Sequence, residues 1–297
     1  MARFIDPRVD WAFKRIFGSE DTKECLITFL NGLFEDELVI KDVTFAKTEK
    51  LGLRPDDRGV VFDVYCITNE GKHVIVEMQK KEQEYFADRA LYYTARAIVQ
   101  QGIRGIWDYH LAPVYTVCFM DFVSQSPILK EFRTDLVLTD LQTRQRVSDR
   151  MRIVYLQLPL FDKHTEAECM DIFDCWIYIV KNMNMFEQMP FSEKYPVFRK
   201  LAEIGDLRKL SREELELYDE DIKNMRDIYA TRKFDEKKGM EIGMAKGMEK
   251  GMAKGMAKGM EKEKLATARR LLSMGLSEAQ VATATELPLE EIQKMKE

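Results

Sequence analysis

Two short runs of apolar, β-branched and aromatic residues stand out in the first third of the chain, residues 60–65 (VVFDVY) and residues 73–79 (HVIVEMQ). Each run has the composition of a β-strand. The segment Asn69-Glu70-Gly71 between them is typical of a tight turn, so the two runs together predict a hairpin.

Helical spacing of apolar residues predicts a helix over residues 9–17, ended by Gly18. A second helix is expected to be capped by Asp21 or Thr22 and to run to Asn31-Gly32.

The rest of the first two-thirds mixes strand and helix patterns. The pattern predicts a strand at residues 39–45, a loop at 50–59, an amphipathic helix at 84–101 ended by Gly102, strands at 113–122 and 152–158, and mostly helix from 166 with breaks near Pro190, Pro196 and Gly205. Strands, a crossover helix and then further strands indicate an α/β core with a mixed sheet.

The hairpin carries acidic side chains where apolar ones are expected. Asp63 falls inside the first run, and Glu77 and Gln79 lie two residues apart in the second, so the latter two should share one face. A buried carboxylate is costly unless it is paired or binds a metal. Two acids converging from paired strands are what a Mg²⁺ site for phosphodiester cleavage needs, because Mg²⁺ prefers oxygen ligands and keeps several waters. A strand-end aspartate capping a turn is the structural alternative for Asp63.

These residues resemble a known family. Asp63 with Glu77-Met78-Gln79 is similar to the D…(D/E)-x-K signature of the PD-(D/E)XK nuclease superfamily, with Gln79 in the lysine position. Further segments resemble the Rpn family of recombination-promoting nucleases and putative transposases over about the first two-thirds of the chain. These segments are Asp6-Pro7, Asp10-x-x-Phe13-Lys14-x-x-Phe17-Gly18, Leu30-Asn31-Gly32-Leu33-Phe34, Arg89-x-x-Tyr92-Tyr93, Leu156-Gln157-Leu158-Pro159-Leu160-Phe161 and Trp176.

The resemblance implies a restriction-endonuclease-like α/β core with a mixed central sheet flanked by helices, followed by a helical C-terminal tail. It implies that Asp63 and Glu77 bind Mg²⁺, with Mn²⁺ as the alternative ion, and that the Met78 carbonyl contributes an oxygen. Glutamine can orient water but supplies no charge. Gln79 would therefore position the attacking water.

Two further residues complete the expected site. Arg89 belongs to a helical stripe that could face the scissile phosphate and stabilise its charge, although such a stripe is equally compatible with an ordinary helix face. The resemblance also suggests Asp10 as an outer metal ligand. The alternative for Asp10 is a surface ion pair with Lys14, one helical turn away.

The tail has a different pattern. Glycine recurs at every fourth residue, mostly as Gly-Met-(Ala/Glu)-Lys, at Gly239, Gly243, Gly247, Gly251, Gly255 and Gly259. Each glycine destabilises a helix by about 0.8–1.0 kcal/mol relative to alanine, so the segment should be frayed or disordered unless a partner packs along it. A self-association or partner-docking stripe and a flexible spacer remain equally compatible with this composition.

Short helices are expected after the repeat, at residues 265–274 closed by Gly275, after a cap at Ser277, and from Leu287. The second of these lacks Arg and Lys, which favours a small protein-interaction bundle over a DNA-reading helix-turn-helix. We therefore expect three parts: a nuclease-like domain with a helical extension (1–232), the repeat segment (233–264) and a small helical module (265–297).

Composition sets limits on function. The 297 residues, 45% of them hydrophobic, can bury one main core plus an appendage. The five cysteines lack paired spacing, and His73, His110 and His164 are dispersed, so no disulfide framework or zinc site is indicated. No apolar run of about 18 residues and no signal-peptide core occur, so we expect a cytoplasmic protein without membrane association.

The net charge of −5 counts against tight non-specific DNA binding by a lone monomer, because phosphate contacts need local positive charge. Two functions therefore follow from the sequence. The first is a Mg²⁺-dependent DNA endonuclease linked to recombination or mobile elements, assembling as a homo-oligomer through its tail. The alternative is a catalytically weak nuclease-fold binding protein that acts through its tail as an assembly or partner-docking module.

Overall fold

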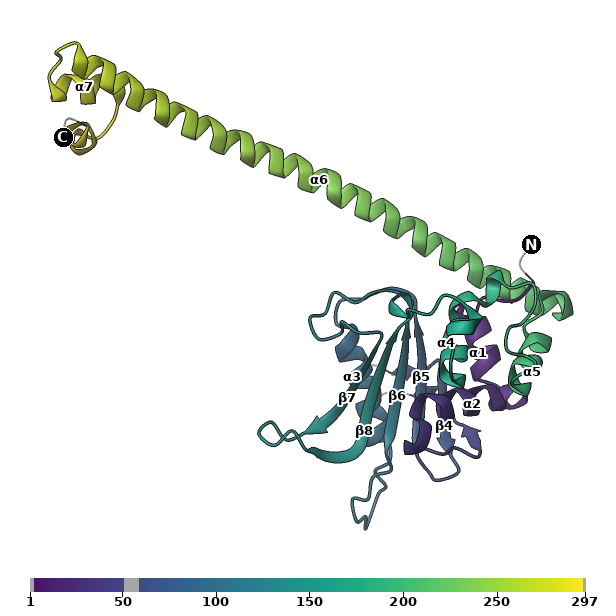
Figure 1. Cartoon of the computed structure of the whole chain (residues 1–297). Coiled ribbons are helices and arrows are strands. Elements are labelled where there is room, and N and C mark those ends of the chain that lie inside the picture. The colour runs from purple at the N-terminus through teal and green to yellow at the C-terminus, as the bar shows by residue number, and fades with distance from the viewer. Residues whose placement is uncertain (1–2, 51–58, 296–297) are drawn as a thin grey trace. The chain divides into compact units, whose positions relative to one another are not determined.

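The computed structural model describes residues 3–50 and 59–295, and the chain divides into two compact units, Met1–Met225 and Arg226–Glu297. The first unit is built on a six-stranded sheet of order β1-β4-β5-β6-β8-β7 (Figure 1). Its strands are β1 (Val43–Phe45), β4 (Val64–Thr68), β5 (His73–Gln79), β6 (Val114–Met120), β7 (Arg133–Thr139) and β8 (Arg146–Gln157). Two further strands, β2 (Glu49–Lys50) and β3 (Val60–Val61), form a separate antiparallel ribbon.

The six-stranded sheet is mixed, which confirms the predicted α/β class. Strands β1, β4 and β5 pair antiparallel, β5, β6 and β8 pair parallel, and β7 is antiparallel to β8. The predicted hairpin joins β4 to β5, and its turn uses Gly71 at φ 77°, in the left-handed region that glycine adopts without strain.

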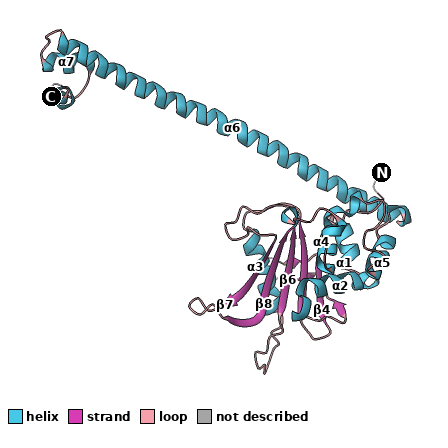
Figure 2. Cartoon of the chain, in the orientation of Figure 1, coloured by secondary structure: helices cyan, strands magenta, loops and turns pink. Residues whose placement is uncertain are grey.

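Helices cover both faces of this sheet (Figure 2). The main core cluster joins one face to residues of α1 (Asp10–Phe17), α2 (Lys23–Phe34), α4 (Ile172–Asn182) and α5 (Pro196–Ile204). The other face packs against α3 (Phe86–Val99). Alternation along β5 sends Val74 and Val76 to the first face and Ile75 to the second, so Glu77 and Gln79, in phase with Ile75, point toward the α3 side.

Helix α2 does not end at Gly32, so the predicted end was wrong. A Cβ added to Gly32 would lie 2.9 Å from a side-chain carbon of Ile172 and 3.1 Å from the backbone nitrogen of Phe173. The glycine therefore permits close packing of α2 on α4 rather than ending the helix. Thr22 precedes α2, but its side chain makes no capping hydrogen bond.

Other predicted boundaries shift at the ends of elements. Strand β1 holds three residues rather than the predicted 39–45, and α3 is shorter at both ends than the predicted 84–101. Of the predicted loop at 50–59, residues 51–58 lie outside the described part of the chain. The predicted helix breaks hold, because Pro196 begins α5 and Gly205 follows its end.

Strand β7 was not predicted, and β8 begins at Arg146, six residues before the predicted start at Arg152. Strand β7 is at the sheet edge and its side chains are all half-buried or exposed. The polar residues of this ribbon obscure the apolar signal that marks the central strands.

Helix α6 (Arg212–Ser273) is continuous through the repeat, so the expectation of a frayed or disordered segment was wrong. Its early residue Tyr218 is buried with the main core, whereas the repeat methionines are 61–72% exposed. Methionine, alanine, glutamate and lysine are good helix formers, and they offset the six glycines.

A small cluster closes the second unit. Gly275, at φ 89°, follows the end of α6, and Ser277 caps α7 (Glu278–Thr285) as predicted, with Gln280 completing a capping box. Ala268 of α6, Val281 of α7 and Ile292 of α8 (Leu289–Lys294) form its buried centre. Among the described residues, none of the helices is both long and apolar enough to cross a membrane.

Candidate active site

Asp63 and Glu77 meet where the hairpin opens toward β3. The β4–β5 register pairs Val64 with Val76, so the next position outward brings Asp63 opposite Glu77. The backbone nitrogen of Asp63 donates to Glu77 Oε1 (3.2 Å), and the backbone nitrogen of Met78 donates to Asp63 Oδ2 (2.8 Å). The Asp63 backbone therefore holds the Glu77 carboxylate, and the Met78 backbone holds the Asp63 carboxylate.

Asp63 lies at a bend between β3 and β4 rather than inside one continuous strand, which corrects the sequence interpretation. The physical reason is that the Asp63 side chain takes a hydrogen bond from the Met78 backbone, in place of a regular ladder partner. The bend separates the small β2–β3 ribbon from the main sheet and leaves Asp63 only partly buried.

Electrostatic repulsion and burial make this pair costly. The pKa of Asp63 is raised to about 6, first by burial and also by the charge of Asp10, while the Met78 hydrogen bond, Lys14 and Arg89 oppose the rise. Glu77 is only 3% exposed, and burial, then the charge of Asp63, raise its pKa well above the ordinary range. A positive charge between the two carboxylates would favour their ionised forms and lower the pKa of both Asp63 and Glu77.

Gln79 and Arg89 lie beside Glu77 on the α3 side of the sheet. Gln79 Nε2 is 3.4 Å from Glu77 Oε2, and an Arg89 guanidinium nitrogen is 3.9 Å from the same oxygen. Arg89 also lies over the ring of Tyr93 at 5.0 Å and donates to Gln83. The structure thus brings Arg89 from α3 to the acids, as the helical stripe suggested.

Helix α1 approaches the same acids from the opposite face. Lys14 Nζ donates to Asp10 Oδ2 at 2.8 Å, as expected for residues one turn apart. Both side chains also act on Asp63, since Asp10 raises its pKa and Lys14 lowers it. The sequence did not predict Lys14 as a cation near the acids, because an ion pair with Asp10 one turn away already explained its charge. Its position after Phe13 in the opening motif was the one sequence feature that pointed to the site.

The opening Asp6-Pro7 segment anchors this end of the molecule. Asp6 is 2% exposed; its carboxylate accepts hydrogen bonds from Arg8 and Asn184, and its backbone nitrogen donates to Tyr218 of α6. Arg8 also reaches Asp121, whose backbone nitrogen donates to the carbonyl of Gln79. These contacts therefore connect the Asp6-Pro7 segment to the end of β5, next to Gln79.

The donor set suits a hard divalent cation bound mainly through two carboxylates. Within residues 3–50 and 59–295, no group of three or more His, Cys, Asp or Glu side chains is arranged to hold a metal. Mg²⁺ often takes one or two carboxylates and keeps several waters, so Asp63 and Glu77 fit that ion. The Met78 side chain is buried in the core, which leaves only its backbone available as a ligand.

A six-stranded mixed sheet flanked by helices, with acids on adjoining strands, is the architecture of a restriction-endonuclease-like domain. Residues 7–233 match the family described as PD-(D/E)XK nuclease family transposase, and the chain belongs to this family. The match confirms the resemblance seen in the sequence and supports a nuclease-related or transposase-related function. No match was found among curated proteins or among solved structures.

Proposed function

We propose that the protein is a Mg²⁺-dependent DNA endonuclease, with Mn²⁺ as an alternative ion. The observation that carries this proposal is the linked pair Asp63 and Glu77, two carboxylates whose pKa values are raised by burial and by neighbouring acids. Their repulsion favours binding of a divalent cation, and membership of a nuclease family supplies the reaction class.

Each residue then has a distinct role. Asp63 and Glu77 hold the cation, together with the Met78 carbonyl. When bound, the ion activates water and neutralises charge on the scissile phosphate. Gln79, hydrogen-bonded to Glu77, orients the attacking water through its amide.

Positive charge compensates for the glutamine at position 79. Arg89 from α3 and Lys14 from α1 both lower the pKa of Asp63 and of Glu77, so cations act on the pair from both faces of the sheet. In this proposal Arg89 contacts a phosphate oxygen and Lys14 holds Asp10, which serves as an outer ligand. Two fixed cations can together supply the field that one lysine supplies in related nucleases.

The exposed repeat favours a second, non-catalytic role. The six repeat methionines are 61–72% exposed, and apart from the helix's own neighbouring backbone nothing described lies within 4 Å of a Cβ built on any of the six repeat glycines. Adaptable methionines beside small residues permit close approach of another helix. We therefore propose that the tail assembles copies of the chain, and a catalytically weak protein would act through this surface alone.

Nicking of supercoiled plasmid tests the primary proposal. Asp63→Ala and Glu77→Ala should each abolish cleavage in Mg²⁺ or Mn²⁺ while leaving the protein folded, because each removes one of the two carboxylate ligands. Asp140→Ala is the matched control, since Asp140 is exposed on the β7–β8 turn and its hydrogen bonds go to its turn neighbours Gln142 and Thr143. Undiminished nicking by both site variants would end the assignment.

A further inference from the structure

A polar cavity lies away from the acid pair. Its volume is about 740 Å³, and it is lined by Phe34, Glu37, Leu38, Lys72, Pro113, Tyr115, Arg146, Val147, Ser148, Asp149, Arg150 and Arg152. In the sheet, Tyr115 pairs with Val74, three residues before Glu77, and its ring packs on Phe34 of α2. The cavity is therefore at the other end of the strands and on the other face from Glu77.

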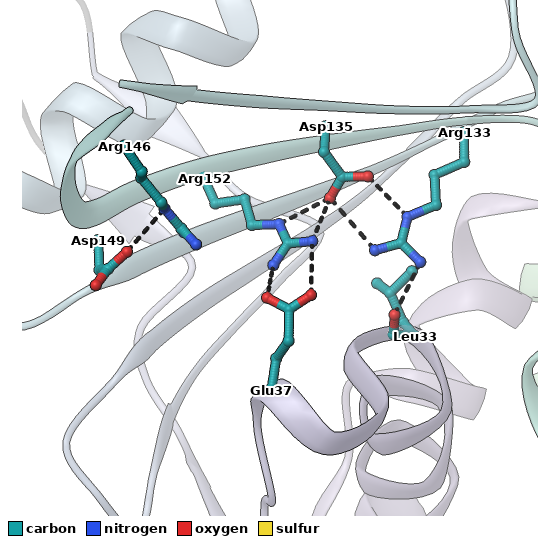
Figure 3. Close-up of polar contacts among 7 residues, drawn as sticks. All are labelled: Leu33, Glu37, Arg133, Asp135, Arg146, Asp149 and Arg152. Atoms are coloured by element: carbon teal, nitrogen blue, oxygen red, sulfur yellow. Dashed lines mark hydrogen bonds and ion pairs between the residues drawn. The ribbon is translucent and has the colours of Figure 1, made fainter. Parts of the chain in front are cut away.

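One wall is a fixed network of arginines and acids (Figure 3). Arg152, with an 8% exposed side chain, binds Glu37 at 2.6 Å and Asp135 at 2.7 Å. Asp135 is also bound by Arg133 at 2.7 Å, which donates in turn to the carbonyl of Leu33 at the end of α2. These contacts tie β7 to the end of α2 and β8 to the turn that follows α2.

The lining carries more positive than negative charge. Four of its side chains are cationic (Lys72, Arg146, Arg150 and Arg152) and two are anionic (Glu37 and Asp149), in a chain whose net charge is −5. Lys72 pairs with Glu70 at 2.6 Å and Arg146 with Asp149 at 2.7 Å, and Arg152 is held by Glu37 and Asp135, whereas Arg150 forms no side-chain ion pair with any described residue. An arginine that no acid neutralises, set among further cations in a concave site, attracts anions.

We propose that this cavity binds a small polyanion through a chain of phosphate groups. Its volume falls within the roughly 300–1,000 Å³ typical of small-molecule sites. The aromatic residues of its floor, Phe34 and Tyr115, are 1% and 9% exposed, so they offer little ring surface for a base to stack on. Recognition therefore falls to the charges, and guanidinium groups suit phosphate oxygens because they donate in pairs.

Calorimetric titration of the full chain with inorganic tripolyphosphate and with ATP, both without metal, tests this site. The double variant Arg146→Gln/Arg150→Gln should bind either probe at least about tenfold more weakly, while Arg144→Gln, an exposed arginine of the same ribbon outside the cavity, should bind normally. Arg152 is left unchanged because its loss would break the ion pairs with Glu37 and Asp135.

The two probes separate the possible sources of phosphate. Equal affinities support the proposal and assign recognition to the phosphate chain alone, whereas tighter ATP binding supports it with a contribution from the nucleoside. Absence of binding at millimolar probe, or equal binding by the double variant, overturns it. A short DNA duplex provides the remaining outcome. If the duplex displaces the probe from the wild-type protein, and the double variant binds the duplex itself more weakly, the proposal is overturned because the surface is then a nucleic-acid contact.

Discussion

Asp63→Asn should stabilise the metal-free protein at neutral and alkaline pH. The substitution keeps an oxygen that can accept the hydrogen bond from the Met78 backbone, but it removes the charge that repels Glu77. The pKa of Asp63 rises from 3.8 to about 6 on folding. A rise of that size corresponds to ~3 kcal/mol, and because Asp63 is only partly buried, solvent screening reduces the expected gain to about 1–3 kcal/mol.

The sign of the pH dependence follows from linkage. A carboxyl group whose pKa is raised in the folded state binds its proton more tightly when the protein is folded. Relative to the ionised state, the protonated group's contribution to the free energy of unfolding is fully present below about pH 4 and is lost as pH rises through about 6. Asparagine does not titrate. The advantage of Asp63→Asn over the wild type should therefore be absent near pH 4, grow between pH 4 and 6, and stay constant above.

Urea unfolding in EDTA at pH 4 and pH 8 measures this difference. Tryptophan fluorescence reports the first unit, which contains Trp11, Trp107 and the fully buried Trp176. In thermal unfolding the gain should appear as about 2–4 °C in Tm per kcal/mol. Adding MgCl₂ should raise the Tm of the wild type more than that of the variant, because a ligand that binds only the folded state stabilises it.

Asp140→Asn provides the opposite control. Hydrogen bonds from Thr143 lower the pKa of this exposed aspartate, so the same substitution should bring no gain at pH 8. If Asp63→Asn is no more stable than the wild type at pH 8, or is equally stabilised at pH 4 and pH 8, the two acids do not repel each other as the geometry requires.

Further changes test packing, catalysis and assembly. Gly32→Ala should cost about 1–3 kcal/mol in urea unfolding because its Cβ meets α4, whereas Gly247→Ala, with open space around it, should not reduce helicity measured by circular dichroism. Arg89→Ala should slow plasmid nicking by about 10²–10³ fold. Gln79→Lys should retain or raise the nicking rate and should partly rescue Arg89→Ala. Strictly additive effects in a double-mutant cycle would contradict a shared role of the two positions. Deleting the chain from Gly239 should leave cleavage per subunit intact but lower the mass measured by light scattering; identical oligomeric states would favour the spacer interpretation.

Prediction from sequence succeeded where local patterns are strong. The apolar runs identified the hairpin and β6, and the period-2 alternation correctly placed Glu77 and Gln79 on one face. It failed for Gly32 because a glycine within a helix and one that ends a helix look alike in sequence. Prediction failed for β7 because this edge strand is polar and lacks the apolar pattern of a buried strand. Its strand conformation depends on pairing with β8.

The sequence by itself determined the α/β class and the family, and it singled out the acidic residues as candidates, because periodicity and motif spacing are local properties of the chain. Only the tertiary structure brought Arg89 and Lys14 to the acids from two helices on opposite faces, and only it raised the pKa of Asp63 and Glu77 through burial. It alone built the arginine-lined cavity, whose lining comes from the end of α2, the turn before β5, the start of β6 and the first half of β8. Charge proximity and desolvation depend on distances between segments far apart in the chain, and no local pattern encodes those distances.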